Sequence, residues 1–314
     1  MSGTNQPNCS NIHDFLLSGI PHLEDFNFWL GFLLISMYIV AVLGNTTILY
    51  IIKVDQELHG PMYIFLFMLS AIDLSLATTT MPRMLGIFWM DDRKIAFDMC
   101  LIQMFFIHFL SALESGVLVA MAVDRYVAIC HPLRYSSILT SEKICKMSAL
   151  NLVRGALVMI PFPLIIKRLP YWKSNVLTHS FCVQQEAMNL ACGDIKVNVI
   201  YGLFGILLVM GIDSLFICVS YVLIIRTVLG MVAETTTKTF STCVAHICAV
   251  LVYYIPLIGL SVVHRLKTNR VPNLHILLGD VYLLIPPVIN PLIYGIKTKQ
   301  IRNRLKKLYR KIIH

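Results

Sequence analysis

Two carboxylates lie inside long apolar stretches of the sequence, where ionisable side chains are rare and costly. Asp73 and Glu114 each stand near the middle of such a stretch, and groups in this setting are candidates for function. If the two faced each other in a low dielectric, their charges would repel, so either one is protonated or a cation lies between them. The alternative is that hydrogen bonds satisfy them, and the available partners are Asn45, Ser75, Ser115 and Asn290.

Three further polar residues stand where apolar stretches end. Arg125, Tyr221 and His246 occupy the same end of three different stretches. Polar groups on different helices can exchange hydrogen bonds when one helix swings, which is what a two-state switch requires. A lone histidine such as His246 is more often structural than ligating, and this one need bind no metal.

Arg265, in the run Ser261-Val-Val-His-Arg265, could recognise an anion. Its guanidinium is permanently charged, and its planar fork of donors fits a carboxylate in bidentate fashion. Lys267 and Arg270 add attraction for anions nearby. The alternative is that Arg265 extends to the membrane interface or pairs with Asp280.

The composition shows what kind of protein must position these groups. Of 314 residues, 57% are hydrophobic and only 14% are charged, and the mean hydropathy is +0.73. Soluble domains carry about 25% charged residues, so this is the composition of a membrane protein. Eight of the 26 Lys and Arg lie between Lys297 and Lys311 beside an apolar segment, so the net charge of +9 indicates anionic lipid rather than nucleic acid. Nine cysteines without a Cys-x-x-Cys pair give no zinc-site signature.

Seven stretches are long and apolar enough to span a membrane as helices, which need about 20 residues. The prediction is an all-α bundle of seven transmembrane helices at 27–52, 60–86, 97–130, 142–166, 196–228, 238–264 and 273–296. Residues 1–26 form an outer tail, 27–296 the membrane domain, and 297–314 an inner amphipathic helix and tail.

Lys and Arg determine the orientation of these helices. Fifteen of them fall on the side of the C-terminus and nine on the other. Positive residues stay inside, so the N-terminus is outside and the protein crosses the membrane several times. Asn8, in the sequon Asn8-Cys9-Ser10, is then a glycosylation candidate on the outer side.

Several motifs carry a family resemblance. The run Met121 to Tyr135, which contains Asp124-Arg125-Tyr126, resembles the inner end of helix three in rhodopsin-like G-protein-coupled receptors, and in its full length their odorant-receptor branch. The runs Pro61 to Tyr63, Lys238 to His246 and Pro287 to Tyr294 resemble odorant receptors in the same order along the chain. Leu17 to Pro21 and Ser261 to Arg265 resemble the class I, family 52-like branch. The resemblance implies a receptor, not an enzyme, that binds small volatile ligands and activates a stimulatory, olfactory-type G protein to raise cAMP.

The resemblance also assigns roles to residues. It implies a sodium ion near Asp73 and Glu114 and no other cofactor, and it implies that Tyr254, beside Pro256, transmits ligand contact to the kink of helix six. The residues implied in switching and G-protein coupling are Asp124, Arg125, Tyr126, Tyr221, Lys238, His246, Tyr254, Asn290, Pro291 and Tyr294.

The outer cysteines match the family only in part. The resemblance pairs Cys100 with Cys182, and an outer location permits the disulfide. Odorant receptors usually carry another cysteine where this chain has Trp172, so Cys192 lacks its expected partner. Cys192 is therefore either a free thiol or paired with Cys9, and we favour the free thiol.

The class I branch is associated with carboxylic acids, which suggests a ligand site. Arg265 would clamp the acid head, and His108, about 24 Å closer to the outer face than Asp124, would complete the polar end with Gln184 and Ser261. Leu257 and Ile258 would accept the alkyl tail.

A different class of function is a transporter or channel for small organic anions. Transporters commonly show two related halves with interrupted helices, and we find no internal repeat. An intramembrane enzyme ranks last, because the segments contain no hydrolase or metalloprotease motif.

Overall fold

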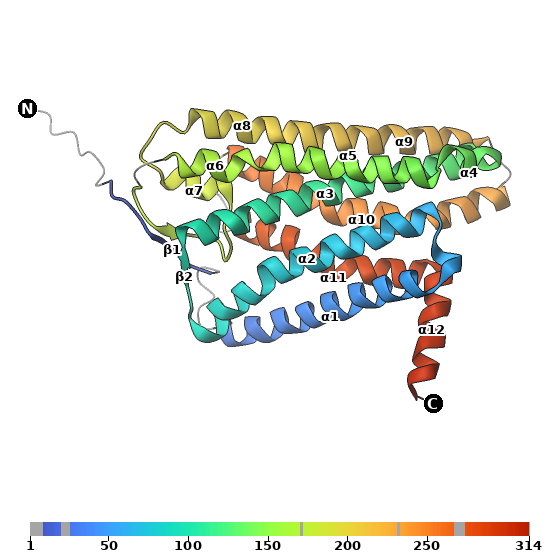
Figure 1. The fold of residues 1–314 in the computed structure, drawn as a ribbon, viewed down its shortest axis with the longest axis horizontal. Coiled ribbons are helices and arrows are strands. Elements are labelled where there is room, and N and C mark those ends of the chain that lie inside the picture. Colours follow the sequence, from blue (N-terminus) through green and yellow to red (C-terminus); the bar gives the residue numbers. More distant parts are fainter. Residues whose placement is uncertain (1–8, 20–25, 170–171, 231–232, 267–273, 314) are drawn as a thin grey trace, which may run out of the picture.

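Seven long helices form the body of the molecule in a computed structural model of the chain (Figure 1). The structure describes residues 9–19, 26–169, 172–230, 233–266 and 274–313, while the side chains of 233–242, 264–266, 309 and 311–313 are outside the description. Within these ranges seven helical segments are long and apolar enough to cross a membrane. The seven expected spans are therefore present.

The spans keep their backbone polar groups paired within each helix, as an apolar bilayer demands. Three of them are single helices near the N-terminus: α1 (Asn27–Val54), α2 (Pro61–Met90) and α3 (Phe97–Cys130). The fourth consists of α5 (Ser141–Met159) and α6 (Pro161–Lys167), and the fifth of α8 (Lys196–Ile206), a π-helical turn (Leu207–Gly211) and α9 (Ile212–Leu229). The last two are α10 (Ala233–Leu266) and α11 (Leu274–Lys297).

Short elements complete the two ends of the bundle. On the inner side, α4 (Tyr135–Ile138) follows α3, and α12 (Lys299–Ile313) runs across the end of the bundle (Figure 1). Ile301 of α12 is fully buried, and Arg304 pairs with Asp55 and Glu57 of the loop after α1. These contacts fix α12 against the inner end of α1.

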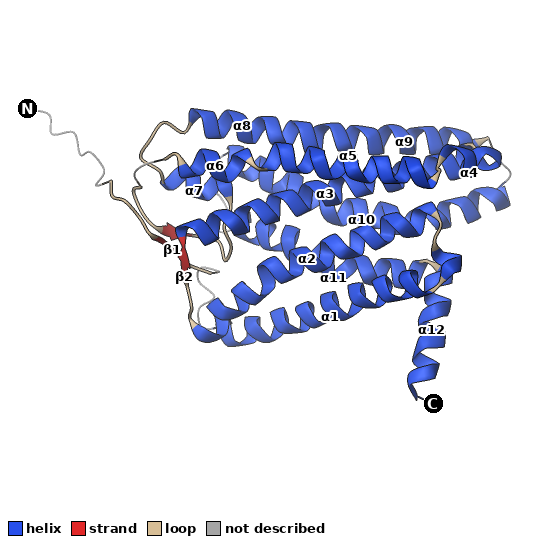
Figure 2. Ribbon diagram, in the orientation of Figure 1, coloured by secondary structure: helices blue, strands red, loops and turns tan. Residues whose placement is uncertain are grey.

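A small sheet at the outer end was not expected from the sequence (Figure 2). Strand β1 (Asp14–Leu17) pairs antiparallel with β2 (Lys94–Ala96) and parallel with β3 (Val176–Leu177). Phe15 and Leu17 of β1 are fully buried. Residues 9–19 of the outer tail are therefore part of the folded domain, and they pack the loop before α3 against the long loop that precedes α8.

Candidate functional site

A cavity of about 100 Å³ lies near the outer end of the bundle, between α3, α6, α8, α10, α11 and the loop that covers them. Most of its lining is apolar. Its polar lining comes from His108, Ser111, Gln184, Ser261 and Tyr282, among others. A small apolar cavity with a few convergent polar groups is the usual form of a small-molecule site.

The structure brings together four of the six residues expected to bind a ligand. His108, Gln184, Leu257 and Ser261 all line the cavity. Gln184 is buried and donates a hydrogen bond to the main-chain oxygen of Asn198 at 3.2 Å, which ties the covering loop to α8.

The prediction that Ile258 contacts the ligand needs correction, because Ile258 does not line the cavity. Its side chain is 55% exposed on the outside of α10, whereas its neighbour Leu257 is 7% exposed and lines the cavity. Successive residues of a helix point about 100° apart, so one of the two can line the cavity while the other faces outward. The Arg265 and Lys238 side chains and Asn8 lie outside the described residues.

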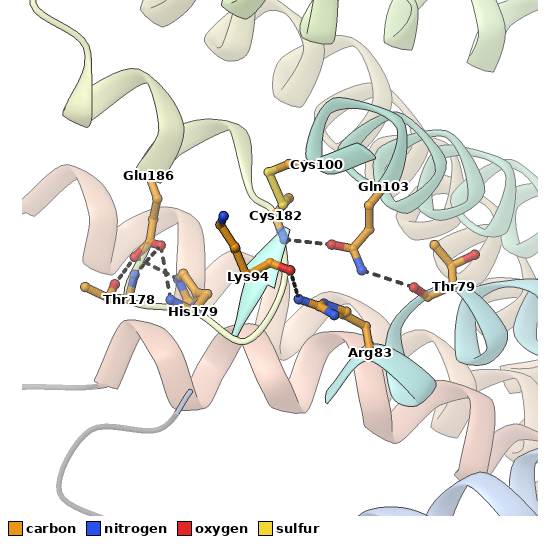
Figure 3. The surroundings of a disulfide bond; sticks show 9 residues. All are labelled: Thr79, Arg83, Lys94, Cys100, Gln103, Thr178, His179, Cys182 and Glu186. Atoms are coloured by element: carbon orange, nitrogen blue, oxygen red, sulfur yellow. Dashed lines mark hydrogen bonds and ion pairs between the residues drawn. A yellow bond between two sulfur atoms is a disulfide. The ribbon is translucent and has the colours of Figure 1, made fainter. Parts of the chain in front are cut away.

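The loop that covers the cavity is held by a disulfide and a hydrogen-bond relay (Figure 3). Cys100, at the start of α3, is joined to Cys182, with 5.5 Å between the Cα atoms. The Cys182 main-chain N–H donates to Gln103 Oε1 at 3.1 Å, and Gln103 Nε2 donates to the main-chain oxygen of Thr79 at 3.1 Å. The loop is thus fixed to both α3 and α2.

The prediction of a free Cys192 thiol is wrong. Cys192 forms a disulfide with Cys9, with Cα atoms 6.3 Å apart. The cause is the outer sheet, because the main chain of Trp172 pairs with Ser10 on one side and with Ala191 on the other. Cys9 and Cys192 are the neighbours of Ser10 and Ala191 in the chain, so these two isolated bridges beside the sheet bring the cysteines together.

Trp172 has a packing role of its own. Its side chain is buried, and its ring packs edge-on against those of Phe15 of β1 and Phe97, with ring centroids 5.4 and 5.6 Å away. Aromatic pairs in this arrangement add about 0.5–1.5 kcal/mol beyond the area they bury. The residue that takes the place of the expected cysteine therefore anchors the outer tail by packing.

Below the cavity lies a charged network that sequence reasoning missed. Arg154 of α5 donates to both carboxylate oxygens of Asp213 in α9, at 2.5 and 2.8 Å. Ser115 of α3 donates to Asp213 at 2.7 Å, and the Ser115 and Tyr254 hydroxyls lie 2.8 Å apart. The network joins four spans, and two ionisable residues inside apolar segments were the signal that should have revealed it.

The two carboxylates expected to share a site lie in a region rich in unpaired oxygens. Asp73 Oδ2 accepts a hydrogen bond from Asn290 Nδ2 at 3.0 Å. Among the described residues, several buried oxygens lack a hydrogen-bond partner: Asp73 Oδ1, both Glu114 oxygens, Asn45 Oδ1 and Asn290 Oδ1. Unpaired buried groups need an explanation, and an all-oxygen donor set suits a hard cation.

At the inner end, the expected switch residues are arranged in two separate groups. Tyr221 and His246 are hydrogen-bonded, with 2.7 Å between hydroxyl and Nδ1, and His246 Nε2 lies 3.0 Å from the main-chain oxygen of Leu118. Arg125 Nε lies 3.8 Å from Asp124 Oδ2, and the guanidinium also contacts the sulfur of Met62. Arg125 is thus engaged by its own helix and by α2.

The Tyr135 hydroxyl closes the second group by donating to Asp124 at 2.6 Å. Burial and this carboxylate raise the pKa of Tyr135 above its ordinary value, so the phenol stays a donor at neutral pH. The Tyr126 hydroxyl lies 3.3 Å from His131 Nε2, and the Tyr294 hydroxyl donates to the sulfur of Met121 at 3.9 Å. Asp124 is therefore shared between Arg125 and Tyr135.

The fold and site define a class of protein: a seven-helix membrane receptor with a ligand cavity near its outer end and polar groups at its inner end. The sequence profile described as "Olfactory receptor" matches residues 34–311. The chain belongs to the olfactory receptor family of G-protein-coupled receptors, proteins that cross the plasma membrane several times and are not enzymes. Membership removes the transporter alternative.

Individual relatives show the same family. The chain is 53% identical to human Olfactory receptor 51E1 over 300 residues, 96% of this chain and 94% of the relative. It is 56% identical to mouse Olfactory receptor 51E2 over 304 residues, 96% and 95% of the two chains. These relatives carry family 51 names, so family 51 replaces the family 52-like subgroup expected from the sequence.

Proposed function

We propose that this olfactory receptor binds small carboxylic acids and signals through a stimulatory G protein that raises cAMP. The observation that carries the proposal is the small cavity with a polar group of residues from α3, α10 and the covering loop. His108, Gln184 and Ser261 line this cavity together. Arg265 follows Ser261 by four residues in the same helix, one turn closer to the outer end, and residues four apart share a helix face.

The size of the cavity supports a short ligand. A cavity needs at least about 10–15 Å³ to hold one water molecule. The observed volume of about 100 Å³ exceeds this minimum but is small, so it favours a small ligand. This suits an acid of short to medium chain length, with the alkyl tail against Leu257 and neighbouring apolar residues.

A route from the cavity to the inner end supports receptor switching. Leu257 and Ser261 line the cavity, and Tyr253 and Tyr254 follow on the same helix one turn toward the inner side. The Tyr253 hydroxyl donates to the main-chain oxygen of Ser111 at 2.7 Å, and Tyr254 contacts the Ser115 hydroxyl. A ligand that shifts α10 would disturb these contacts and the Tyr221–His246 bond further along the same helix.

We also propose that a sodium ion binds between Asp73 and Glu114. The unpaired oxygens of these residues, Asn45 and Asn290 supply the donors it would need. When bound, the ion would neutralise charge between the two carboxylates. The expected result is that sodium raises the thermal stability of the purified receptor more than potassium does, and that Asp73→Asn removes the difference.

The ligand proposal is tested by a cAMP reporter assay in cells with aliphatic acids of graded length and their matched alcohols. We expect an optimum along the acid series and weak responses to the alcohols, which leave the guanidinium unpaired. A charge-assisted hydrogen bond contributes roughly 1.5–3 kcal/mol, or about ten- to a hundredfold in affinity. Arg265→Ala should lose at least this much potency, and Arg265→Lys an intermediate amount.

The matched control is Arg93→Ala, which removes another outer arginine. Arg93 pairs with Asp91 on the surface and does not line the cavity, so its variant should respond like the parent. Equal potency of alcohols and acids on the parent would contradict the choice of ligand. A response to acids without any rise in cAMP would contradict the choice of G protein alone.

A further inference from the structure

Two histidines and a glutamate meet at the outer end of the bundle, beside the cavity. His179 lies in the covering loop, Glu186 in the short helix α7 (Gln184–Leu190), and His275 in the first turn of α11. Their candidate ligand atoms all lie within 4.8 Å of one another. We propose that these three residues form a binding site for a zinc-class divalent transition-metal ion.

The ligand set and its spacing suit such an ion. Zn²⁺ takes imidazole nitrogens at about 2.0–2.1 Å and carboxylate oxygens at about 2.0–2.2 Å, so two ligands of a tetrahedral site lie about 3.3–3.5 Å apart. Glu186 Oε1 lies 3.6 Å from His179 Nε2 and 4.0 Å from His275 Nε2. The two imidazole rings are perpendicular, with centroids 5.5 Å apart. Shifts of roughly 1 Å or less would bring all three groups to coordination distance.

Two of the three groups are held firmly in place (Figure 3). Glu186 accepts hydrogen bonds from the main-chain N–H groups of Thr178 at 3.0 Å and His179 at 3.2 Å, and also from the Thr178 hydroxyl. Outer hydrogen bonds of this kind orient metal ligands.

The position of His179 is set by α11. A Cβ atom on Gly279 would lie 3.1 Å from His179 Cε1, so the imidazole packs directly against the helix backbone. His275 precedes Gly279 by one helical turn and therefore lies on the same face of α11. Its side chain is 33% exposed.

The site would join the covering loop to α11 at the wall of the cavity. His179 and Gly279 both line the cavity. Three protein ligands leave one coordination position of a zinc ion for water or for an external ligand atom. The proposal is independent of the acid proposed as ligand, because it requires only the ion and these three side chains.

The test measures zinc binding to the full-length receptor purified in detergent, stripped with a chelator and titrated against a fluorescent zinc chelator. We expect each receptor molecule to take up one zinc ion in competition with the chelator. His275→Ala and Glu186→Gln should each weaken binding at least about tenfold, since even changes outside the first ligands cost 10- to 100-fold. Glu186→Gln keeps an oxygen that can accept the Thr178 and His179 hydrogen bonds, so the fold is retained. His13→Ala, which removes an exposed outer histidine away from the cluster, should bind zinc like the parent.

A second variant separates coordination from folding. His275→Cys replaces one zinc ligand with another and should restore zinc binding relative to His275→Ala. Loaded with Co²⁺, it should show a sulfur-to-cobalt absorption band that the parent lacks. The proposal is overturned if the parent fails to compete for zinc, if both His275→Ala and Glu186→Gln bind like the parent, or if His275→Cys gives no such band.

Discussion

Removing either partner of the Arg154–Asp213 pair should destabilise the receptor far more than removing a surface ion pair. The guanidinium contacts both carboxylate oxygens, and the Asp213 side chain is 4% exposed. Breaking a buried pair costs about 3–5 kcal/mol, because it leaves an uncompensated charge. The Arg154 side chain is 25% exposed, but it lies at mid-span beside hydrocarbon, so water does not screen it and the cost is not reduced.

The expected shift follows from this cost. For a long chain, each kcal/mol of lost stability lowers the thermal midpoint by about 2 °C. Asp213→Asn or Arg154→Met should therefore lower the midpoint by roughly 6–10 °C. The double variant removes both charges, and Asn at position 213 still accepts from Ser115. The double variant should therefore lose much less stability than the two single variants lose together. The interaction energy from this double-mutant cycle should lie near the upper end of about 0.5–3 kcal/mol.

The assay is thermal unfolding of the four purified proteins, with Asp91→Asn as control. Asp91 pairs with Arg93 at 2.5 Å, but its side chain is 77% exposed, and surface pairs contribute about 0–1 kcal/mol. If the two single losses add in the double variant, the charges are not coupled. If the single losses are no larger than that of Asp91→Asn, burial of the pair does not matter for stability.

Three shorter predictions concern the outer tail, the switch and the orientation. Cys9→Ser and Cys192→Ser should each lower stability by about 2–5 kcal/mol, and the double variant should lose no more than either single variant. Cys145→Ser, at an exposed free thiol, should have little effect. Additive losses of the two single variants in thermal unfolding would argue against the Cys9–Cys192 bond. Arg125→Ala should abolish the cAMP response at matched surface expression, and an unchanged response would remove Arg125 from the switch. Tags on both ends, stained on intact cells, should label only the N-terminus.

The sequence predicted the spans well, because hydrophobic length is a direct physical requirement of the bilayer. The expected spans 27–52 and 97–130 match α1 and α3 to within two residues. The same reasoning missed the outer sheet. Strands of two to four residues carry almost no periodic signal, and β1 pairs with segments about 80 and 160 residues away. The Cys9–Cys192 disulfide was the less favoured of two sequence alternatives, because the bridges through Trp172 that bring the two cysteines together give equally little signal in the sequence.

The residues of the site were harder to predict, because hydrophobicity does not distinguish the inside of a membrane protein from its lipid-facing surface. Leu257 and Ile258 are equally apolar, yet one lines the cavity and the other faces outward. In a soluble helix the polar face would have shown which was which. Here lipid is as apolar as the core, so both faces read alike.

Polar residues therefore carry most of the information about which side of a membrane helix faces inward. Ser115 and Ser111 mark the inner face of α3, and Asp213 marks that of α9, since each would be costly against lipid. The rule also makes Arg154 and Asp213 candidates for pairing, because an unpaired charge at mid-span is costly. Applied to α10, the rule places Tyr254 and Ser261 inward, and Leu257 and Ile258, three and four residues after Tyr254, are both compatible with that face. Polar neighbours therefore identify the face of α10 that turns inward, whereas only the packing of the bundle decides that Leu257 lines the cavity and Ile258 faces outward.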